Sequence, residues 1–302
     1  MENAMIAQPF PVVVGVDESA GANQALAWAI DEARSRRLAL RLVCAYGSVL
    51  NYGGLAMYGN LPPVDPSLAR QVTTDLLGQA VAHVKELAPD LDVTTCVVDD
   101  DAAHALIEES SRASLIVLGS RHLASVGSVL LGSVSAAVSA RAACPVVVLR
   151  GPAGLADEPT TVVVGVDGHA SSEGVIEFAF DYASRRSVPL NAVLCWHPDR
   201  LAEMMWRAEP PAPEKARAWL SEALAGWQEK YPDVVVQSAV VRDHPIAGLV
   251  AASAAQDLLV VGSRGRHALA GTLLGSVSQG VLHHATCPIA LVPSTTHAWS
   301  SS

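Results

Sequence analysis

Apolar residues in this chain gather in short runs that alternate with longer amphipathic stretches. The run Val12–Val16 is valine at every position but one, which is typical of a strand buried on both faces of a sheet. Residues 22–36 place apolar side chains at helical spacing, and Leu40–Tyr46 is a second apolar run. A strand, a helix and a strand in this order predict a βαβ unit in a parallel sheet.

The same alternation continues to residue 149. Beyond a longer connection, the pattern predicts a helix centred on Leu76–Leu87, a strand over Asp92–Val98, a helix over Ala102–Ser111, a strand over Leu115–Gly119, a helix over Ser133–Ala142 and a strand over Pro145–Leu149. Open sheets of this kind bind ligands beyond the carboxyl ends of their strands, where the strand order reverses. A ligand site is therefore expected at that edge.

The whole pattern occurs twice in the chain. Residues 12–40 align without a gap to residues 162–190, at an offset of 150. Residues 96–120 align to residues 239–263, at an offset of 143. The offsets differ because the first copy has a longer connection after its second strand. The chain is therefore a tandem repeat of one unit.

A short connecting segment separates the two copies. Residues 151–160 are rich in glycine, proline and acidic residues, as is typical of a linker. The sequence predicts a first domain over 1–152, a linker over 153–160 and a second domain over 161–302. Each domain is expected to be of the α/β class, with a parallel five-stranded sheet and helices on both of its faces.

Composition narrows the classes of function. The chain has 302 residues, of which 50% are hydrophobic, and a formal net charge of −10. An acidic protein is not expected to bind nucleic acid in general, because that requires a basic surface. A nucleotide remains possible, since backbone amides and one or two local cations can hold it.

The cysteines and the N-terminal residues indicate in which cellular compartment the protein is expected. The five cysteines are far apart and form no CxxC pattern, so neither a disulfide framework nor a metal site is predicted. The start of the chain lacks the pattern of a signal peptide, and no apolar stretch has membrane-spanning length. We therefore expect a cytoplasmic protein that does not enter a membrane.

One segment after the fourth strand of each copy carries candidate chemistry. Gly119 and Gly262 end that strand, and Gly132-Ser133 and Gly275-Ser276 open the next helix. Amides in the first turn of a helix lack intrahelical partners and favour anions. The segment therefore predicts a phosphate site, although no Walker A pattern occurs. Hydroxyl donors would come from Ser133, Ser135, Ser276 and Ser278, and cations from Arg121 and Arg264.

A single Gly-Ser pair at a helix start is more simply a turn and an N-cap. Two copies, each preceded by a matched Gly-Ser-Arg, favour the phosphate interpretation. The spacing Gly262-x2-Gly265-x9-Gly275-Ser276 also resembles the ATP-binding signature of the universal stress protein family. The stretches "VVGVDGHASS" and "TCPIALVP" resemble that family too, and "LAGWQEKYPDVVVQSAVVRDHP" resembles tandem members from actinobacteria.

This resemblance implies two tandem Rossmann-like domains of the adenine nucleotide alpha hydrolase-like kind. It implies an adenine nucleotide in each unit, ATP with or without Mg²⁺, with AMP and cyclic AMP as alternatives. Asp17 and Asp167 would contact the base and ribose end, and Ala45 and Cys195 would lie near the adenine. The glycine-rich segments and the helix starts would line the phosphates.

The residues assigned to ATP binding follow from this placement. In the first unit they are Gly15, Val16, Asp17, Ala45, Gly119, Ser120, Arg121, His122, Gly132, Ser133, Val134 and Ser135. In the second unit they are Gly165, Val166, Asp167, Cys195, Gly262, Ser263, Arg264, Gly265, Arg266, Gly275, Ser276, Val277 and Ser278. No residue is assigned to catalysis or to a metal.

The first unit departs from the signature at one glycine. His122 stands where the second unit has Gly265, and the loop after the third strand reads Asp99-Asp100-Asp101 instead of Arg242-Asp243-His244. If that loop lines the site, it makes the first site more negative and less suited to a triphosphate. The alternative for the acidic loop is a solvated turn and helix cap. We expect the second site to bind more tightly.

The resemblance implies a nucleotide-dependent regulatory protein of the stress response rather than an enzyme. A slow ATPase and a ligand-free interaction scaffold with a degenerate first domain are the alternatives. The final strands, Val146–Leu149 and Ile289–Val292, are candidate sheet edges. The resemblance implies that the two domains pair through these strands and that two chains form a homodimer. Neither nucleic acid nor a membrane is an expected partner.

Overall fold

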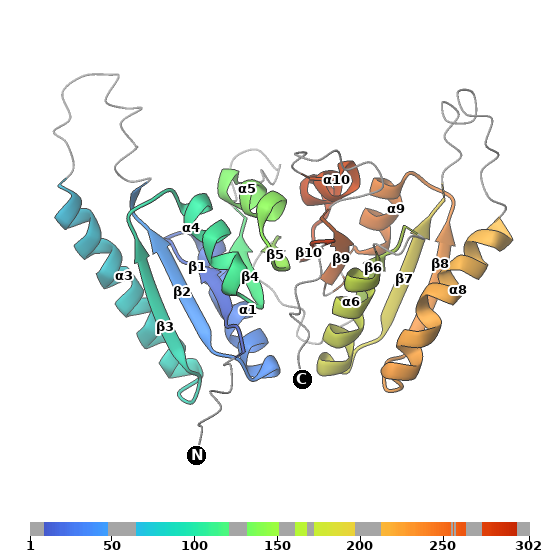
Figure 1. The fold of residues 1–302 in the computed structure, drawn as a ribbon, viewed down its shortest axis with the longest axis horizontal. Coiled ribbons are helices and arrows are strands. Elements are labelled where there is room, and N and C mark those ends of the chain that lie inside the picture. The colour runs from blue at the N-terminus through green and yellow to red at the C-terminus, as the bar shows by residue number, and fades with distance from the viewer. Residues whose placement is uncertain are drawn as a thin grey trace, which may run out of the picture. The chain divides into compact units, whose positions relative to one another are not determined.

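The structure is a computed structural model that describes residues 9–47, 65–120, 132–150, 161–167, 172–196, 213–254, 256, 258–263 and 274–294. These residues form two compact units that largely follow the two repeats of the chain, although residues 147–150 group with the second unit (Figure 1). Residues 151–160 lie outside the described residues, so the domain limits and the linker stay predictions. No helix in the described part of the chain is long and apolar enough to cross a membrane.

The first unit alternates strands and helices along the chain. Its elements are β1 (Val12–Gly15), α1 (Ala20–Arg36), β2 (Leu40–Ala45), α3 (Pro66–Leu87), β3 (Val93–Val98), α4 (Ala102–Glu109), the 3₁₀ turn η3 (Ser110–Arg112), β4 (Leu115–Gly119), α5 (Ser133–Arg141) and β5 (Val146–Leu149). The strand order is β3-β2-β1-β4-β5, and β1 pairs in parallel with both β2 and β4. The order therefore reverses between β1 and β4.

The second unit repeats this plan. Its elements are β6 (Val162–Gly165), α6 (Glu173–Arg186), β7 (Leu190–Cys195), α8 (Pro213–Lys230), β8 (Val236–Val241), α9 (Pro245–Ala252), β9 (Leu258–Gly262), α10 (Ser276–His284) and β10 (Ile289–Val292). The strand order is β8-β7-β6-β9-β10. Even the register repeats, since Val12 faces Leu40 in β2 and Val162 faces Leu190 in β7.

Helices cover both faces of each sheet (Figure 1). Right-handed crossovers place α1 and α3 on one face, because β1, β2 and β3 follow one another outward, and place α4 and α5 on the other face. The valines of β1 are fully buried between these layers. The predicted α/β class, with a parallel five-stranded sheet in each half, is confirmed.

One helix starts earlier than the apolar pattern predicts. The pattern centred it on Leu76–Leu87, whereas α3 begins at Pro66. The Asp65 side chain caps the helix by accepting from the Ser67 backbone N–H at 2.9 Å, and proline occupies the first turn. The sequence Asp-Pro-Ser is a local signal for the start of this helix. The first turns contain few buried residues, however, so the apolar pattern there has only a weak helical periodicity.

Candidate functional site

The strand ends that carry the predicted site residues meet at one edge of each sheet. In the first unit, Val14 faces Val117 of β4 and Gly15 faces Val43 of β2. The Val16 N–H extends the pairing by donating to the Val43 carbonyl at 2.9 Å. Because β1 lies between β2 and β4, the residues that follow these three strands share the carboxyl edge. The second unit has the same register, so Asp167, Cys195 and Gly262 share its edge.

The aspartate after the first strand of each unit is held by the start of the next helix. In the first unit, Asp17 is exposed and its Oδ1 accepts from the Ser19 N–H at 2.8 Å, while Ser19 caps α1. In the second unit, the Ser172 hydroxyl donates to Asp167 Oδ1 at 2.7 Å. Both carboxylates are thus oriented at the edge by a hydrogen bond from a nearby serine.

A cysteine lies near the end of the second strand in each unit, but Cys44 is the last residue but one of β2 and Cys195 is the last of β7, so their side chains point to opposite faces of the sheet. Burial is the main cause that raises the pKa of Cys195 to about 11, and the charge of Asp243 adds to it. Burial and the charge of Asp17 raise the pKa of Cys44 to about 11 in the first unit. The thiolate form of both side chains is therefore disfavoured at neutral pH. They serve as neutral packing surface.

The helix after the fourth strand of each unit opens at the same edge. In the second unit, Gly275 is the N-cap of α10, and its N–H donates to the Ser263 carbonyl at 2.9 Å. The exposed Ser276 follows, at the first helical position. In the first unit, α5 begins likewise with the exposed Ser133. First-turn amides have no intrahelical acceptor, so each helix start can bind an anion.

Two of the four predicted serine donors are used inside the protein. The Ser135 hydroxyl donates to the Gly119 carbonyl at 3.0 Å, and the Ser278 hydroxyl donates to the Gly262 carbonyl at 2.5 Å. Both serines are buried. Their assignment as phosphate donors is therefore corrected: they fasten the helix start to the strand end. The exposed Ser133 and Ser276 keep the assignment as a prediction.

One glycine of the predicted site is required by packing, and two others lie in tight contact with side chains of the next layer. A Cβ on Gly119 would lie 2.2 Å from the carbonyl carbon and oxygen of Gly21, at the start of α1. A Cβ on Gly15 would lie 3.3 Å from Leu106 of α4, and one on Gly165 would lie 3.1 Å from Leu249 of α9. Gly119 was expected to line the phosphates through its turn, but its lack of a side chain is needed for the close approach of a helix.

Several predicted site residues lie outside the described residues. These are Arg121 and His122 in the first unit and Arg264, Gly265 and Arg266 in the second. Their roles stay predictions. Val16 and Val166 are buried just below the edge, whereas Ala45 is half-buried at the end of β2. Among the described residues, no three His, Cys, Asp or Glu side chains group as a metal ion would need.

Two aromatic residues that the sequence also places at this edge, without assigning them to ATP binding, flank it on its outer side. Tyr46 follows β2, and Trp196 follows β7 in the second unit. The Trp196 ring lies against Arg242, whose guanidinium carbon is 5.3 Å from the centroid. In the first unit, the charge of Asp99 and a hydrogen bond to it raise the pKa of Tyr46, after burial as the largest cause. The repeat pairs these two positions in the sequence, whereas the contact of Trp196 with Arg242 appears only in the structure.

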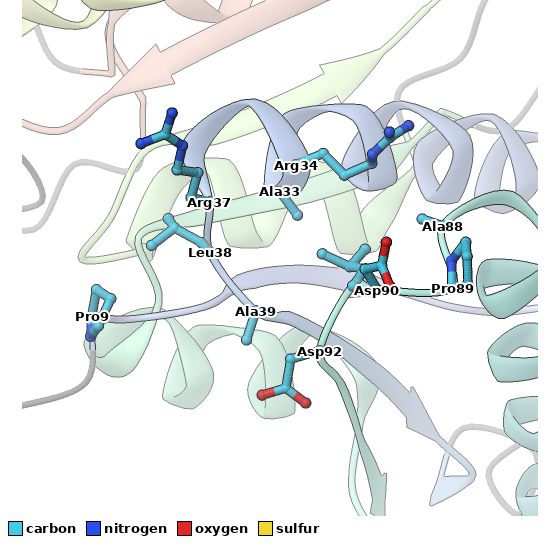
Figure 2. A pocket seen from close by; sticks show the side chains of 11 residues that line it. Pro9, Ala33, Arg34, Arg37, Leu38, Ala39, Ala88, Pro89, Asp90 and Asp92 are labelled. Atoms are coloured by element: carbon cyan, nitrogen blue, oxygen red, sulfur yellow. The ribbon is translucent and has the colours of Figure 1, made fainter.

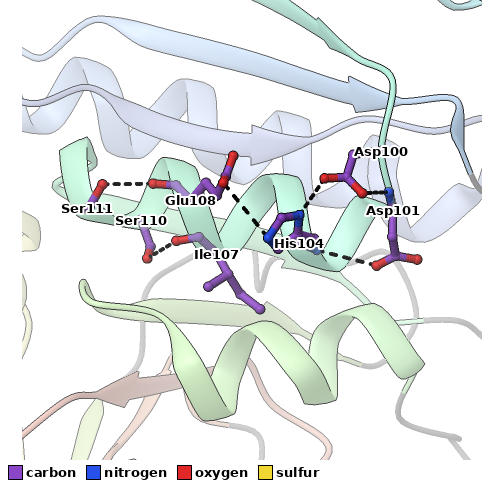
Figure 3. A network of polar contacts seen from close by, with 7 residues as sticks. All are labelled: Asp100, Asp101, His104, Ile107, Glu108, Ser110 and Ser111. Carbon is purple, nitrogen blue, oxygen red and sulfur yellow. Dashed lines mark hydrogen bonds and ion pairs between the residues drawn. The ribbon is translucent and has the colours of Figure 1, made fainter.

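A polar network surrounds the start of α4, next to the edge of the first unit (Figure 3). Asp101 caps the helix by accepting from the Ala103 N–H at 2.9 Å. His104 Nδ1 bonds Asp100, and its Nε2 lies 3.8 Å from Glu108 Oε1. The hydrogen bond to Asp100 is the main cause that raises the pKa of His104, and the same bond lowers the pKa of Asp100. The network therefore favours the imidazolium form of His104 over the neutral form.

Replacing Asp100 with asparagine is expected to lower the pKa of His104, because the largest stabiliser of the imidazolium is lost. The ion pair stabilises the fold below the raised pKa of His104 and above the lowered pKa of Asp100. It is lost when the pH passes out of that window in either direction. An NMR titration of His104 measures the shift. Glu108→Gln should give a smaller decrease, and an unchanged pKa in Asp100→Asn would contradict the assignment.

A separate pocket of about 500 Å³ lies at the opposite, amino end of the first unit (Figure 2). It is formed where α1 leads into β2, by residues that include Arg34 and Arg37, and where α3 leads into β3, by residues that include Asp90 and Asp92. Charges of both signs line it at exposed positions. It contains none of the predicted site residues.

Comparison with known proteins agrees with this architecture. The universal stress protein family model matches residues 10–150 and again residues 159–293. A universal stress protein of Mycobacterium tuberculosis is 38% identical over 288 residues, which cover 92% of this chain and 95% of that protein. One from Mycolicibacterium smegmatis is 35% identical over 295 residues, which cover 95% of this chain and 98% of the relative.

A solved structure shows the same fold over the full length. The crystal structure of a universal stress protein from Archaeoglobus fulgidus aligns with a TM-score of 0.69 and 16% sequence identity, covering 94% of this chain and 98% of that one. The family model and the mycobacterial relatives both span the two repeats. The chain therefore belongs to the universal stress protein family, as a tandem member.

Proposed function

We propose that each unit binds an adenine nucleotide at its carboxyl edge and that the protein is a nucleotide-dependent regulator in the stress response. The single observation that carries this proposal is an oriented carboxylate facing the strand-end edge where a helix starts, present in both units. Asp17 and Asp167 suit the ribose hydroxyls, because a carboxylate accepts from both. The starts of α5 and α10 suit the phosphates.

The base would lie beside the second strand of each unit. Ala45 and Cys195 end β2 and β7, and both are half-buried at the edge. The raised pKa of Cys195 keeps its sulfur uncharged, which suits contact with an aromatic ring. ATP is the proposed ligand. The second site is proposed to bind more tightly, because the first unit carries the acidic Asp99–Asp101 loop and has His122 in place of a glycine.

Replacing Asp167 with asparagine is expected to weaken nucleotide binding at the second site about tenfold, as loss of one charged hydrogen bond predicts. Asparagine keeps an acceptor for the Ser172 hydroxyl, so the edge should retain its shape. Asp17→Asn should weaken the first site in the same way. Calorimetric titration of the full chain with ATP, AMP and cyclic AMP measures both sites, and mass spectrometry of ligand released on denaturation identifies what the protein carries.

Asp233→Asn is the matched control. Asp233 also accepts a serine hydroxyl, from Ser184 at 2.6 Å, but it precedes β8 at the amino end of that strand. We expect no change in nucleotide affinity from this variant. The proposal fails if none of the three nucleotides binds the full chain, or if Asp17→Asn and Asp167→Asn bind as tightly as the wild type.

A further inference from the structure

The pocket at the amino end of the first unit has cations on one side and carboxylates on the other (Figure 2). Arg34 and Arg37, at the end of α1, line the first side, and Asp90 and Asp92, in the turn between α3 and β3, line the second. All four residues are exposed. Within the part of the chain that the structure describes, none of these four side chains makes a hydrogen bond or an ion pair. A ligand that carries both charges would therefore find a free partner for each.

The floor between the two sides is apolar and buried. Ala33 is 0% exposed, Ala88 is 4% exposed and Leu91 is 8% exposed. The Lys85 ammonium of α3 holds the turn by donating to the carbonyls of Pro89 at 3.1 Å and Leu91 at 2.7 Å. The volume of about 500 Å³ lies within the range of roughly 300–1,000 Å³ that is typical of small-molecule sites. The pocket is thus preformed and large enough for a small ligand.

The second unit has the same backbone at this place. Arg37 and Ser187 follow α1 and α6 with the same φ of 55°. The turns after α3 and α8 close with matching hydrogen bonds, at 3.1 Å to the Ala88 carbonyl and at 3.2 Å to the Tyr231 carbonyl. The side chains of the two units can therefore be compared position by position.

The second unit joins the two sides directly. Ser184 matches Arg34 and Asp233 matches Asp90. The Ser184 hydroxyl donates to Asp233 Oδ2 at 2.6 Å, so one hydrogen bond links the end of α6 to the turn after α8. The first unit has a guanidinium and a carboxylate at these positions, and these two described side chains form no ion pair. A bridging ligand would supply the missing link.

The second unit also supplies an aromatic ring at this place. Tyr231 matches Ala88, and its ring stacks on that of Phe180 with centroids 5.7 Å apart. The first unit has Ile30 in place of Phe180. Because Ala88 lines the pocket, the position from which the second unit extends a ring is open to a ligand in the first unit.

We propose that this pocket binds an α-amino acid with an aromatic side chain, as its zwitterion. The carboxylate of the ligand pairs with Arg34 and Arg37, because guanidinium and carboxylate form strong, charge-assisted hydrogen bonds. Its ammonium donates to Asp90 and Asp92. Its ring covers the apolar floor beside Ala88. The proposal is independent of nucleotide binding, which belongs to the opposite end of the strands.

The test is a titration of the full chain with L-phenylalanine, followed by NMR, in which the amide signals of Leu38 and Leu91 locate the site. Two analogues each lack one charge: 3-phenylpropanoate has no ammonium, and phenethylamine has no carboxylate. Both should bind about tenfold more weakly, as the loss of charged hydrogen bonds predicts. L-alanine, which has no ring, should also bind about tenfold more weakly, because it buries less apolar surface.

Two variants test the pocket residues. Ala88→Tyr introduces the residue of the second unit and should abolish binding, because the added ring takes the place of the ligand. Arg34→Ser likewise introduces the second unit's residue and should weaken binding about tenfold. Arg70→Ser is the matched control, since it removes the same charge near the start of α3, at the other end of that helix from the pocket. It should leave the affinity unchanged.

Circular dichroism establishes that each variant is folded, and Arg34→Ser keeps the test decisive if Ala88→Tyr is not. The proposal is overturned if L-phenylalanine does not bind the full chain, or if both one-charge analogues bind as tightly as L-phenylalanine. It is also overturned if a folded Ala88→Tyr protein binds like the wild type, or if Arg34→Ser and Arg70→Ser have equal effects.

Discussion

Replacing Gly119 with alanine is expected to lower the free energy of unfolding of the first unit by about 3 kcal/mol, near the upper end for overpacking a tight contact. The added Cβ would lie 2.2 Å from the carbonyl group of Gly21 and 2.8 Å from the Ala22 nitrogen. These are backbone atoms, which cannot rotate away as the end of a side chain can. The start of α1 would have to move off β4.

Gly78→Ala is the matched control for this substitution. Gly78 lies within α3, and a Cβ there would meet nothing within 4 Å. The same change of residue should raise stability by about 0.5–1 kcal/mol, because alanine lowers the entropy of the unfolded chain and favours the helix. Urea unfolding measures the free energies, and hydrogen exchange locates the loss in α1 and β4. A Gly119→Ala protein as stable as the wild type would contradict the close approach.

The contact of Gly119 with Gly21 also bears on the proposed site. It brings the start of α1, whose cap Ser19 follows Asp17, next to the end of β4. The carboxylate and the strand end that leads toward α5 are thereby held together. A rigid first turn positions a ligand group better than a loop does. Movement of α1 in the alanine variant should therefore also weaken nucleotide binding in the first unit.

The fold follows from local patterns to a large extent. The strand predicted over Leu115–Gly119 has these bounds in the structure, and the helix predicted over Ser133–Ala142 ends one residue earlier. Buried valine runs and helical spacing are local properties, and the repeat supplies each pattern twice. The resemblance to the universal stress protein family, carried by the glycine signature of the second unit and by its strand motifs, is confirmed by the family model. These features can be predicted without knowing which segments of the chain are in contact.

The roles of individual site residues depend on contacts that the sequence does not display. Successive helix positions turn by about 100°, so Ser133 and Ser135 point about 200° apart and only one can face the edge. Ser135 faces inward and binds the Gly119 carbonyl. Gly119 is needed because of Gly21, which is distant in the sequence. Arg242 gains its position from Trp196, on a neighbouring strand end.

The ion pair between Arg41 of β2 and Glu109 of α4 clamps a helix to the sheet only in the first unit. Arg41 Nε donates to Glu109 Oε2 at 2.8 Å, and a terminal nitrogen donates to Oε1 at 3.1 Å. The Glu109 side chain is 10% exposed, whereas that of Arg41 is 26% exposed. The hydrogen bond to Glu109 is the main cause that raises the pKa of Arg41. Loss of the ion pair should therefore be more costly for the buried Glu109 carboxylate than for the Arg41 guanidinium.

Replacing Arg41 with asparagine is expected to lower the free energy of unfolding by about 2 kcal/mol, because it leaves a largely buried carboxylate without its ion-pair partner. Glu109→Ala should cost about 1 kcal/mol, since the partly exposed Arg41 can turn to water. The second unit has Asn191 and Ala252 at these positions and folds in the same way, so the double variant copies a tolerated pair. We expect it to cost no more than Glu109→Ala alone. Urea unfolding of the four proteins gives the coupling energy, and single costs that simply add would show that the clamp contributes nothing.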